Sequence, residues 1–399
     1  MGPKILLLSW RVPPDLTGAS IVVMNLAQQF TRDKMIVAGE KPFGKTAFRW
    51  RPEWPEIVYV QSMWPVTNRG LRWWRMIQFP RLVWNCLRLV RRHKVGTMVV
   101  VLPSAQFLFA GYLVARWTGC RFYPYFHNTY YECRQGLERR FAAWLQKRVF
   151  ASAEHVFVMS EGMSELYQER YPGVAQTPLL HTFNEALPAA EMRPLGSPLR
   201  FAFAGNVNQS CEDAMVRLAG AVLECPGARL SIISGTPRRH LENLGLLGER
   251  TSHETVPRDA MLRRLAEADV VLLPHGLTGP DSREEYLTIF PTKTIECLIC
   301  GRPILAHCTA GSFLARFLRE NDCALVVDEP DVAALREAIT KLRTDADLRL
   351  RLVRNALKTA ERFQASRVAE ELRARLAVPR AALRGEETIP TGEVDPFQS

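Results

Sequence analysis

The segment that decides the fold combines Val270-Val271-Leu272-Leu273-Pro274 with Pro291-Thr292-Lys293-Thr294-Ile295-Glu296-Cys297-Leu298-Ile299-Cys300-Gly301-Arg302-Pro303. Its first, apolar run predicts a buried parallel strand. Thr292 is placed to cap a short helix, Gly301 to end it in the left-handed conformation, and Pro303 to prevent it from resuming. Because residues 275–290 between the two runs are mostly polar, the segment predicts strand, long loop, helix and strand.

Lys293 stands in the first turn of the predicted helix, where a cation opposes the helix dipole. A bound anion would reverse this effect, because free helix amides and an ammonium group together suit a phosphate. Glu296 lies one turn later on the same face, where it can accept hydrogen bonds from sugar or ribose hydroxyls. A solvent-exposed Lys293–Glu296 ion pair explains the same spacing equally well.

The rest of the chain alternates predicted strands and helices, which favours an α/β fold with doubly wound sheets. The proline-rich residues 188–198 predict a linker, which leaves an N-terminal domain over residues 1–187 and a C-terminal domain over 199–362. Residues 363–378 contain a predicted helix, and the polar residues 379–399 predict a disordered tail. Strands are expected at Lys4–Ser9, Met35–Ala38, Ile57–Val60, Arg121–Phe126, His155–Met159, Arg200–Ala204 and Arg229–Ile233.

Positive charge is concentrated in the N-terminal half. The chain carries 52 basic and 41 acidic residues, a formal charge of +11 at pH 7, and no acid lies between Glu56 and Glu132. Residues 64–94 interleave tryptophan with arginine, a mixture that suits an anionic membrane surface. A solvated helix whose tryptophans pack inward explains this pattern equally well. Nucleic-acid binding is disfavoured because no recognised motif accompanies the charge.

The nine cysteines are odd in number, scattered and mostly within apolar runs, which favours reduced thiols in a cytoplasm. Cys297 and Cys300 have the spacing of a metal pair, but no second pair accompanies them and both fall in a predicted helix. We therefore expect them to pack as small buried residues, and we expect no metal site.

Two further positions stand where a ligand could approach. His127 follows a predicted strand, the place where open parallel sheets bind ligands, although a lone histidine is more often structural. Gly18 ends a loop over residues 11–19 before a helix expected from Ser20 to Phe30. A glycine at a helix start lets a ligand approach the backbone, but a single glycine is weak evidence.

These motifs resemble those of GT-B glycosyltransferases, and more specifically the family 4 retaining group. The resemblance covers about residues 1–378. It is carried by Gly18 with Val22-Val23-x-Asn25-Leu26-Ala27, by Phe126-His127-Asn128, by Val156-Phe157-Val158-Met159-Ser160, by Phe203-Ala204-Gly205-Asn206, and by the Pro-x-Lys-x-x-Glu motif that starts at Pro291.

The resemblance implies two Rossmann-like domains facing each other across a cleft, with helix 363–378 crossing back to the first. It also implies transfer of a sugar from a nucleotide sugar, with retention of configuration and without a metal or other cofactor. Catalytic roles would fall to His127, Lys293 and Glu296. Donor contacts would come from Gly205, Asn206, Gly235, Val256, Glu284, Glu285, Thr292, Lys293 and Glu296, while Thr17 and Gly18 would shape the acceptor side.

The chain departs from the family pattern at two places. The first of the family's two glutamates would fall on Thr288, so either Glu284 or Glu285 replaces it or the sugar contact is absent. The basic residues that often follow the phosphate glycine loop are missing after Gly205, and Lys293 would supply that charge. A non-catalytic GT-B relative that acts as a nucleotide- or membrane-binding assembly protein is the alternative.

The expected partners are a nucleotide sugar and a saccharide or lipid-linked acceptor, as in the synthesis of cell-surface polysaccharide or glycolipid. Because residues 64–94 lie in the half that binds acceptors in similar enzymes, we expect a cytoplasmic protein that contacts the inner membrane face peripherally.

Overall fold

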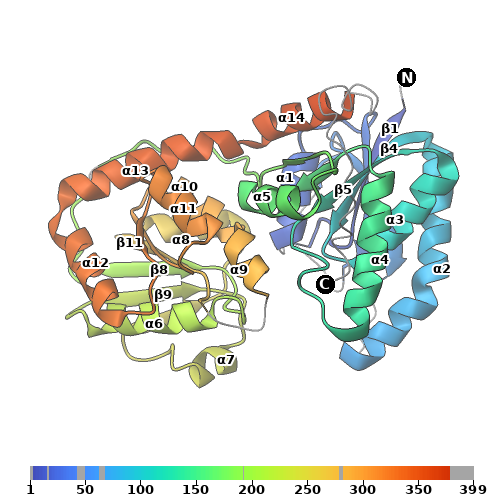
Figure 1. Cartoon of the computed structure of the whole chain (residues 1–399). Helices are drawn as coiled ribbons and strands as arrows, with labels where there is room; N and C mark the ends of the chain where they lie inside the picture. Colours follow the sequence, from blue (N-terminus) through green and yellow to red (C-terminus); the bar gives the residue numbers. More distant parts are fainter. Residues whose placement is uncertain are drawn as a thin grey trace. The chain divides into compact units, whose positions relative to one another are not determined.

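The computed structural model describes residues 3–15, 18–42, 50–62, 68–191, 193–277 and 282–377, without the side chains of residues 68–75, 258 and 259. Thr17 and the predicted tail over residues 379–399 lie outside this part. The chain divides into two compact units. Unit 1 comprises Met1–Asn184 with Gln364–Ser399, and unit 2 comprises Glu185–Phe363. Figure 1 shows that each unit is a sheet covered by helices.

Unit 1 contains, within the described residues, a seven-stranded parallel sheet in the order β3-β2-β1-β4-β5-β6-β7. Its strands are β1 (Lys4–Ser9), β2 (Met35–Lys41), β3 (Glu56–Ser62), β4 (Val95–Leu102), β5 (Arg121–Phe126), β6 (Val156–Val158) and β7 (Gln176–Pro178). Its helices are α1 (Gly18–Ala27), α2 (Asn68–His93), α3 (Ala105–Thr118), α4 (Gly136–Ser152), α5 (Glu161–Arg170) and α14 (Ala365–Ala377). The central strands β1 and β4 are mostly apolar and buried, as expected where helices cover both faces of the sheet.

Unit 2 contains, in its described residues, a six-stranded parallel sheet in the order β10-β9-β8-β11-β12-β13. The strands are β8 (Arg200–Ala204), β9 (Arg229–Ile233), β10 (Thr251–Glu254), β11 (Val270–Pro274), β12 (Ile304–His307) and β13 (Leu325–Val327). The helices are α6 (Glu212–Glu224), α7 (Arg238–Asn243), α8 (Arg258–Ala266), α9 (Arg283–Thr288), α10 (Lys293–Ile299), α11 (Phe313–Glu320), α12 (Val332–Thr344) and α13 (Ala346–Ala360), followed by the 3-10 turn η1 (Glu361–Phe363).

Both sheets confirm the predicted doubly wound α/β fold. In each, the strand order reverses once, between β1 and β4 in unit 1 and between β8 and β11 in unit 2. The carboxyl ends of the strands beside such a switch point are where open α/β sheets bind ligands. The chain order therefore selects the residues after β8 and β11, and those near β1 and β4, as candidate sites.

The C-terminal helix belongs to unit 1 although its sequence follows unit 2. Helix α14 packs against α1, and Val368 and Leu372 join the hydrophobic core around Leu7 and Val99. The backbone amide of Ala365 donates to the carbonyl oxygen of Phe183 at 2.9 Å, so the chain leaves and re-enters unit 1 at neighbouring points.

The structure corrects three local predictions. Residues 275–290 are not one long loop, because α9 forms within them and the Ser282 hydroxyl accepts the Glu285 amide at 3.2 Å to cap it. Helix α1 begins at Gly18 rather than Ser20. The strand expected at His155–Met159 is shorter, Val156–Val158. Among the described residues, every helix is too short or too polar to cross a membrane.

Candidate functional site

The two predicted glycine loops of unit 2 lie together at the carboxyl ends of β8 and β9. Gly205 has a φ of +126°, a conformation that residues with side chains rarely adopt, and its amide donates to the Ile233 carbonyl oxygen at 3.0 Å. A Cβ at Gly235 would lie 3.3 Å from Asn206 Oδ1. Gly235 and Asn206 are exposed, so these loops present backbone and an amide side chain at the switch point.

Thr236 joins the two loops. Its Oγ1 accepts from the Val207 amide at 2.9 Å and from the Ser234 hydroxyl at 2.8 Å, and all three residues are buried. Gly235 and Val256, both predicted to contact the donor, lie at this edge of the sheet. Val256 is half-buried after β10, where its neighbour Thr255 donates to the Ser234 carbonyl oxygen at 2.8 Å. The hydrogen bonds hold the loop backbones in one arrangement.

Lys293 is brought to the Gly205 loop by the start of α10. Its Nζ lies 5.1 Å from the centroid of the Phe203 ring, and a Cβ on Gly205 would lie 3.9 Å from Lys293 Cβ. The predicted cap on this helix is wrong, because the Thr292 side chain makes no capping hydrogen bond and its backbone is already helical. The ammonium group is therefore positioned by packing on an aromatic ring two residues before the glycine.

The predicted glutamates lie on the two helices that follow β11. Glu285 on α9 and Glu296 on α10 are 4% and 8% exposed, whereas Glu284 is half-buried. The low exposure of Glu296 removes the explanation of Lys293–Glu296 as a solvent-exposed ion pair. Thr288 stands where a family glutamate was expected, and its hydroxyl donates to the Glu284 carbonyl oxygen of its own helix at 2.8 Å.

His275 is a candidate that the sequence reasoning missed. It follows β11 directly, on the other side of the switch point from Gly205, and its ring is buried. Burial and the Lys293 charge lower the pKa of His275 to about 3, so the imidazole is neutral at physiological pH. Its Nε2 has no hydrogen-bond partner among the described residues. The sequence could have predicted it, because His275 directly follows a predicted strand, just as His127 does.

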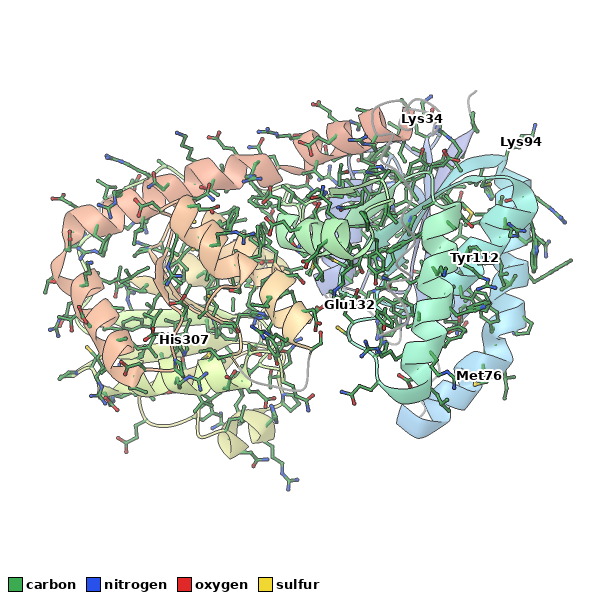
Figure 2. The ribbon with its side chains drawn as sticks, viewed as in Figure 1. Lys34, Met76, Lys94, Tyr112, Glu132 and His307 are labelled. Atoms are coloured by element: carbon green, nitrogen blue, oxygen red, sulfur yellow. The ribbon has the colours of Figure 1, made fainter. Side chains whose placement is uncertain are left out.

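Asp213 holds the turn after His275 against α6. Its carboxylate accepts the Leu277 amide at 3.0 Å and pairs with Arg217 at 2.7 Å. Arg217 Nε donates to Nε2 of His307 at 3.0 Å, so the His307 proton resides on Nδ1, which donates to the Val327 carbonyl oxygen at 2.8 Å. His307, labelled in Figure 2, thereby joins α6 to the strand ends. These hydrogen bonds hold Gly276 and Leu277 against α6.

In unit 1, His127 lies at the carboxyl end of β5 and is buried beside a second histidine. The His127 ring is 4.2 Å from the Tyr125 ring and 5.6 Å from the His181 ring, centroid to centroid. Burial and then the neighbouring His181 hold the pKa of His127 well below its usual value, and burial lowers the pKa of His181 to about 4. Neither His127 Nε2 nor the two His181 nitrogens have a partner among the described residues.

Buried polar atoms almost always form hydrogen bonds, so a pair of neutral imidazoles with unused nitrogens suits a ligand that offers both donors and acceptors. Sugar hydroxyls offer both. His181 was missed by the sequence reasoning, although it follows the last strand of unit 1 by three residues.

Gly18, the other predicted residue of unit 1, is the first residue of α1, and Thr17 lies outside the described residues. The helix is fixed further along by Asn25, whose side-chain amide donates to the Thr182 carbonyl oxygen at 2.5 Å. Because Thr182 adjoins His181, this bond ties α1 to the histidine pair.

One cysteine adjoins the Gly205 loop, since Cys211 Sγ lies 3.7 Å from the Asn206 carbonyl oxygen. All nine cysteines are free, and burial raises the pKa of Cys300 to about 12, which leaves its thiol protonated and unreactive. No group of three or more histidine, cysteine, aspartate or glutamate side chains suited to a metal ion occurs among the described residues.

Comparison with protein families assigns both halves of the chain. Residues 16–179 match the model described as Glycosyltransferase Family 4, and residues 198–345 match the model described as Glycosyl transferases group 1. No curated protein matches the sequence.

Solved structures share the fold at low sequence identity. Sucrose-phosphate synthase from Thermosynechococcus elongatus is 16% identical with a TM-score of 0.71, covering 94% of this chain and 98% of its own. HepE from Anabaena, solved with UDP and glucose, is 16% identical with a TM-score of 0.69, covering 94% and 100%. An α,α-trehalose-phosphate synthase from Burkholderia xenovorans, solved with glucose-6-phosphate, is 11% identical with a TM-score of 0.64, covering 94% and 100%.

The two matched families together span most of the chain, and the two parallel sheets have the architecture of these solved enzymes. The chain therefore belongs to the GT-B glycosyltransferases, with a family 4 region followed by a glycosyl transferases group 1 region.

Proposed function

We propose that this glycosyltransferase takes its sugar from a nucleoside diphosphate sugar bound at the carboxyl ends of β8 and β11. The observation that carries the proposal is the position of Lys293, whose ammonium group lies over Phe203 beside the Gly205 loop. A cation and exposed backbone at a switch point suit a diphosphate. The complexes of HepE with UDP-glucose and with UDP and glucose support a donor of this class.

Charge stabilisation is the step that these residues would supply. When the bond between the sugar and the diphosphate breaks, negative charge develops on the leaving phosphate. A preorganised ammonium group stabilises that charge without rearranging during the reaction. Lys293 would perform this role, while Gly205 and Gly235 allow close approach and Glu296 accepts hydrogen bonds from the ribose.

The neutral histidines of unit 1 would bind saccharide hydroxyls. His127 and His181 are buried with unused ring nitrogens, so they can donate to one hydroxyl and accept from another. We further propose that transfer retains the anomeric configuration and that the acceptor is a saccharide, with a lipid-linked saccharide as the first candidate. An enzyme with such an acceptor would act in polysaccharide or glycolipid synthesis at the inner face of a membrane.

The purified protein tests this proposal when it is incubated with UDP-, GDP- and ADP-sugars in turn and release of the nucleoside diphosphate is measured. We expect release from one donor class, by slow hydrolysis without an acceptor and faster with one. A His127→Ala variant should lose most of that release. Absence of release from every donor, despite tight nucleotide binding, would favour the non-catalytic relative instead.

A further inference from the structure

The exposed large hydrophobic side chains gather on three helices of unit 1. Nine such side chains are exposed among the described residues, and seven of them lie on α2, α3 or α4. Single exposed hydrophobic residues are ordinary, whereas a gathering of this kind marks an interaction surface. We name it the three-helix surface, and its members are Met76, Ile77, Trp84, Trp117, Leu137, Phe141 and Trp144.

Aromatic contacts link the three helices. Phe79 of α2 stacks on Phe109 of α3 with 5.1 Å between ring centroids. Phe109 also contacts Phe141 and Trp144 of α4 at 5.9 and 5.6 Å. Helix α3 thus lies between α2 and α4, as Figure 1 shows, and Figure 2 labels Met76 on α2 and Tyr112 on α3.

The outer face of α2 mixes these apolar side chains with arginine. Ile77, Trp84, Arg88 and Arg91 follow one another at intervals of seven, four and three residues, which places them on one side of the helix. Ile77 is 70% exposed and Trp84 is 62% exposed, so the explanation in which the tryptophans pack inward is wrong for Trp84. Arg88 and Arg91 line a shallow hollow together with Trp84.

The charge on the three helices has a single sign almost throughout. Between residues 76 and 118 there is no aspartate or glutamate, and Glu138 is the one acid on α4. On α4, the Arg148 guanidinium lies 4.3 Å from the centroid of the Trp144 ring. Arginine bonds to lipid phosphates while indole rings settle at headgroup depth, so this composition matches an anionic bilayer.

We propose that the three-helix surface docks the protein peripherally on an anionic lipid bilayer. The surface is wider than residues 64–94, because four of its seven exposed side chains lie on α3 and α4. A second copy of the chain is a poorer occupant, since a symmetric contact would bring the same arginines against each other. The proposal does not depend on the identity of the sugar donor or acceptor.

Co-sedimentation with vesicles tests the proposal on the full chain. Vesicles of phosphatidylglycerol and phosphatidylcholine in equal parts are compared with vesicles of phosphatidylcholine alone, at low and at high salt. The charge variant combines Arg88→Glu with Arg91→Glu, and its control combines Arg239→Glu with Arg354→Glu on unit 2, which changes the net charge equally. The apolar variant combines Trp84→Ser with Leu137→Ser, and its control is Val216→Ser, which is exposed on α6 of unit 2.

We expect the wild type and both controls to sediment with the anionic vesicles at low salt and to be released at high salt. Both surface variants should bind at least about tenfold more weakly while keeping the wild-type circular dichroism. Wild-type protein that stays in the supernatant with both vesicles would overturn the proposal. Equal weakening by the charge variant and its control would also overturn it, because net charge alone would then explain binding. The proposal would also be overturned if the wild type formed a dimer that the surface variants dissociate and did not bind vesicles.

Discussion

The ammonium group of Lys293 lies 5.1 Å from the centroid of the Phe203 ring, at the point where β8 gives way to Gly205. A cation held over an aromatic ring is attracted by the ring quadrupole but keeps its charge and its donors for another ligand. Phe203 thereby fixes the direction of Lys293 without consuming its charge. This contact explains how the start of α10, which follows β11, brings a positive charge to the Gly205 loop, which follows β8.

The conformation of Gly205 predicts a substitution effect that sequence alone would not. At a φ of +126°, an alanine is strained, and its Cβ would approach Lys293. Gly205→Ala should lower the free energy of unfolding by about 1–2 kcal/mol and weaken nucleotide binding by about tenfold. Chemical denaturation and titration calorimetry measure the two effects.

The matched control is Gly220→Ala on α6, where a Cβ would meet no atom within 4 Å. In an exposed helix interior this change should raise the free energy of unfolding by about 0.5–1 kcal/mol and leave nucleotide affinity unchanged. Effects of the same sign at both positions would contradict the account of the Gly205 loop.

His127 should affect turnover without affecting nucleotide affinity. It belongs to unit 1, whereas the proposed diphosphate contacts belong to unit 2. His127→Asn should therefore reduce kcat by about 100-fold or more while the Kd for the nucleoside diphosphate stays the same. Steady-state kinetics and calorimetry on one preparation separate the two quantities. A rise in that Kd equal to the fall in kcat would mean that His127 acts on the nucleotide instead.

The buried histidines predict a loss of stability in weak acid. The folded-state pKa values are about 4 for His181 and about 3 for His275, both below the unfolded value of roughly 6.5. Below about pH 6.5 the unfolded chain binds protons that the folded chain does not. As the pH falls below about 6.5, each of these histidines therefore lowers the free energy of unfolding by about 1.4 kcal/mol per pH unit, until the pH reaches its folded-state pKa.

Denaturant unfolding at several pH values between about 6.5 and 4 measures this slope. His181→Gln removes one titrating group, so its slope should be smaller than that of the wild type by about 1.4 kcal/mol per pH unit. An unchanged slope would show that His181 is protonated in the folded protein, which is incompatible with its burial as a neutral imidazole.

The sequence predicted the doubly wound sheets because continuous apolar runs such as residues 270–273 have few alternatives to buried parallel strands. It failed for α9, whose signal was the Ser282-x-x-Glu285 pattern of a capped helix within a polar stretch. His275 and His181 were missed for a different reason. Their unused nitrogens arise from packing between elements far apart in the chain, which residue spacing does not encode.

Binding of UDP, GDP and ADP to the wild type and to Lys293→Met, measured by titration calorimetry, tests the central claim most directly. Methionine keeps the length and apolar character of the side chain but removes its charge. Lys358→Met on α13 is the control, since it removes an equal charge elsewhere. We predict that one nucleoside diphosphate binds the wild type and the control equally well, and Lys293→Met at least about tenfold more weakly. Equal affinity in all three proteins would contradict the assignment of Lys293 to the diphosphate.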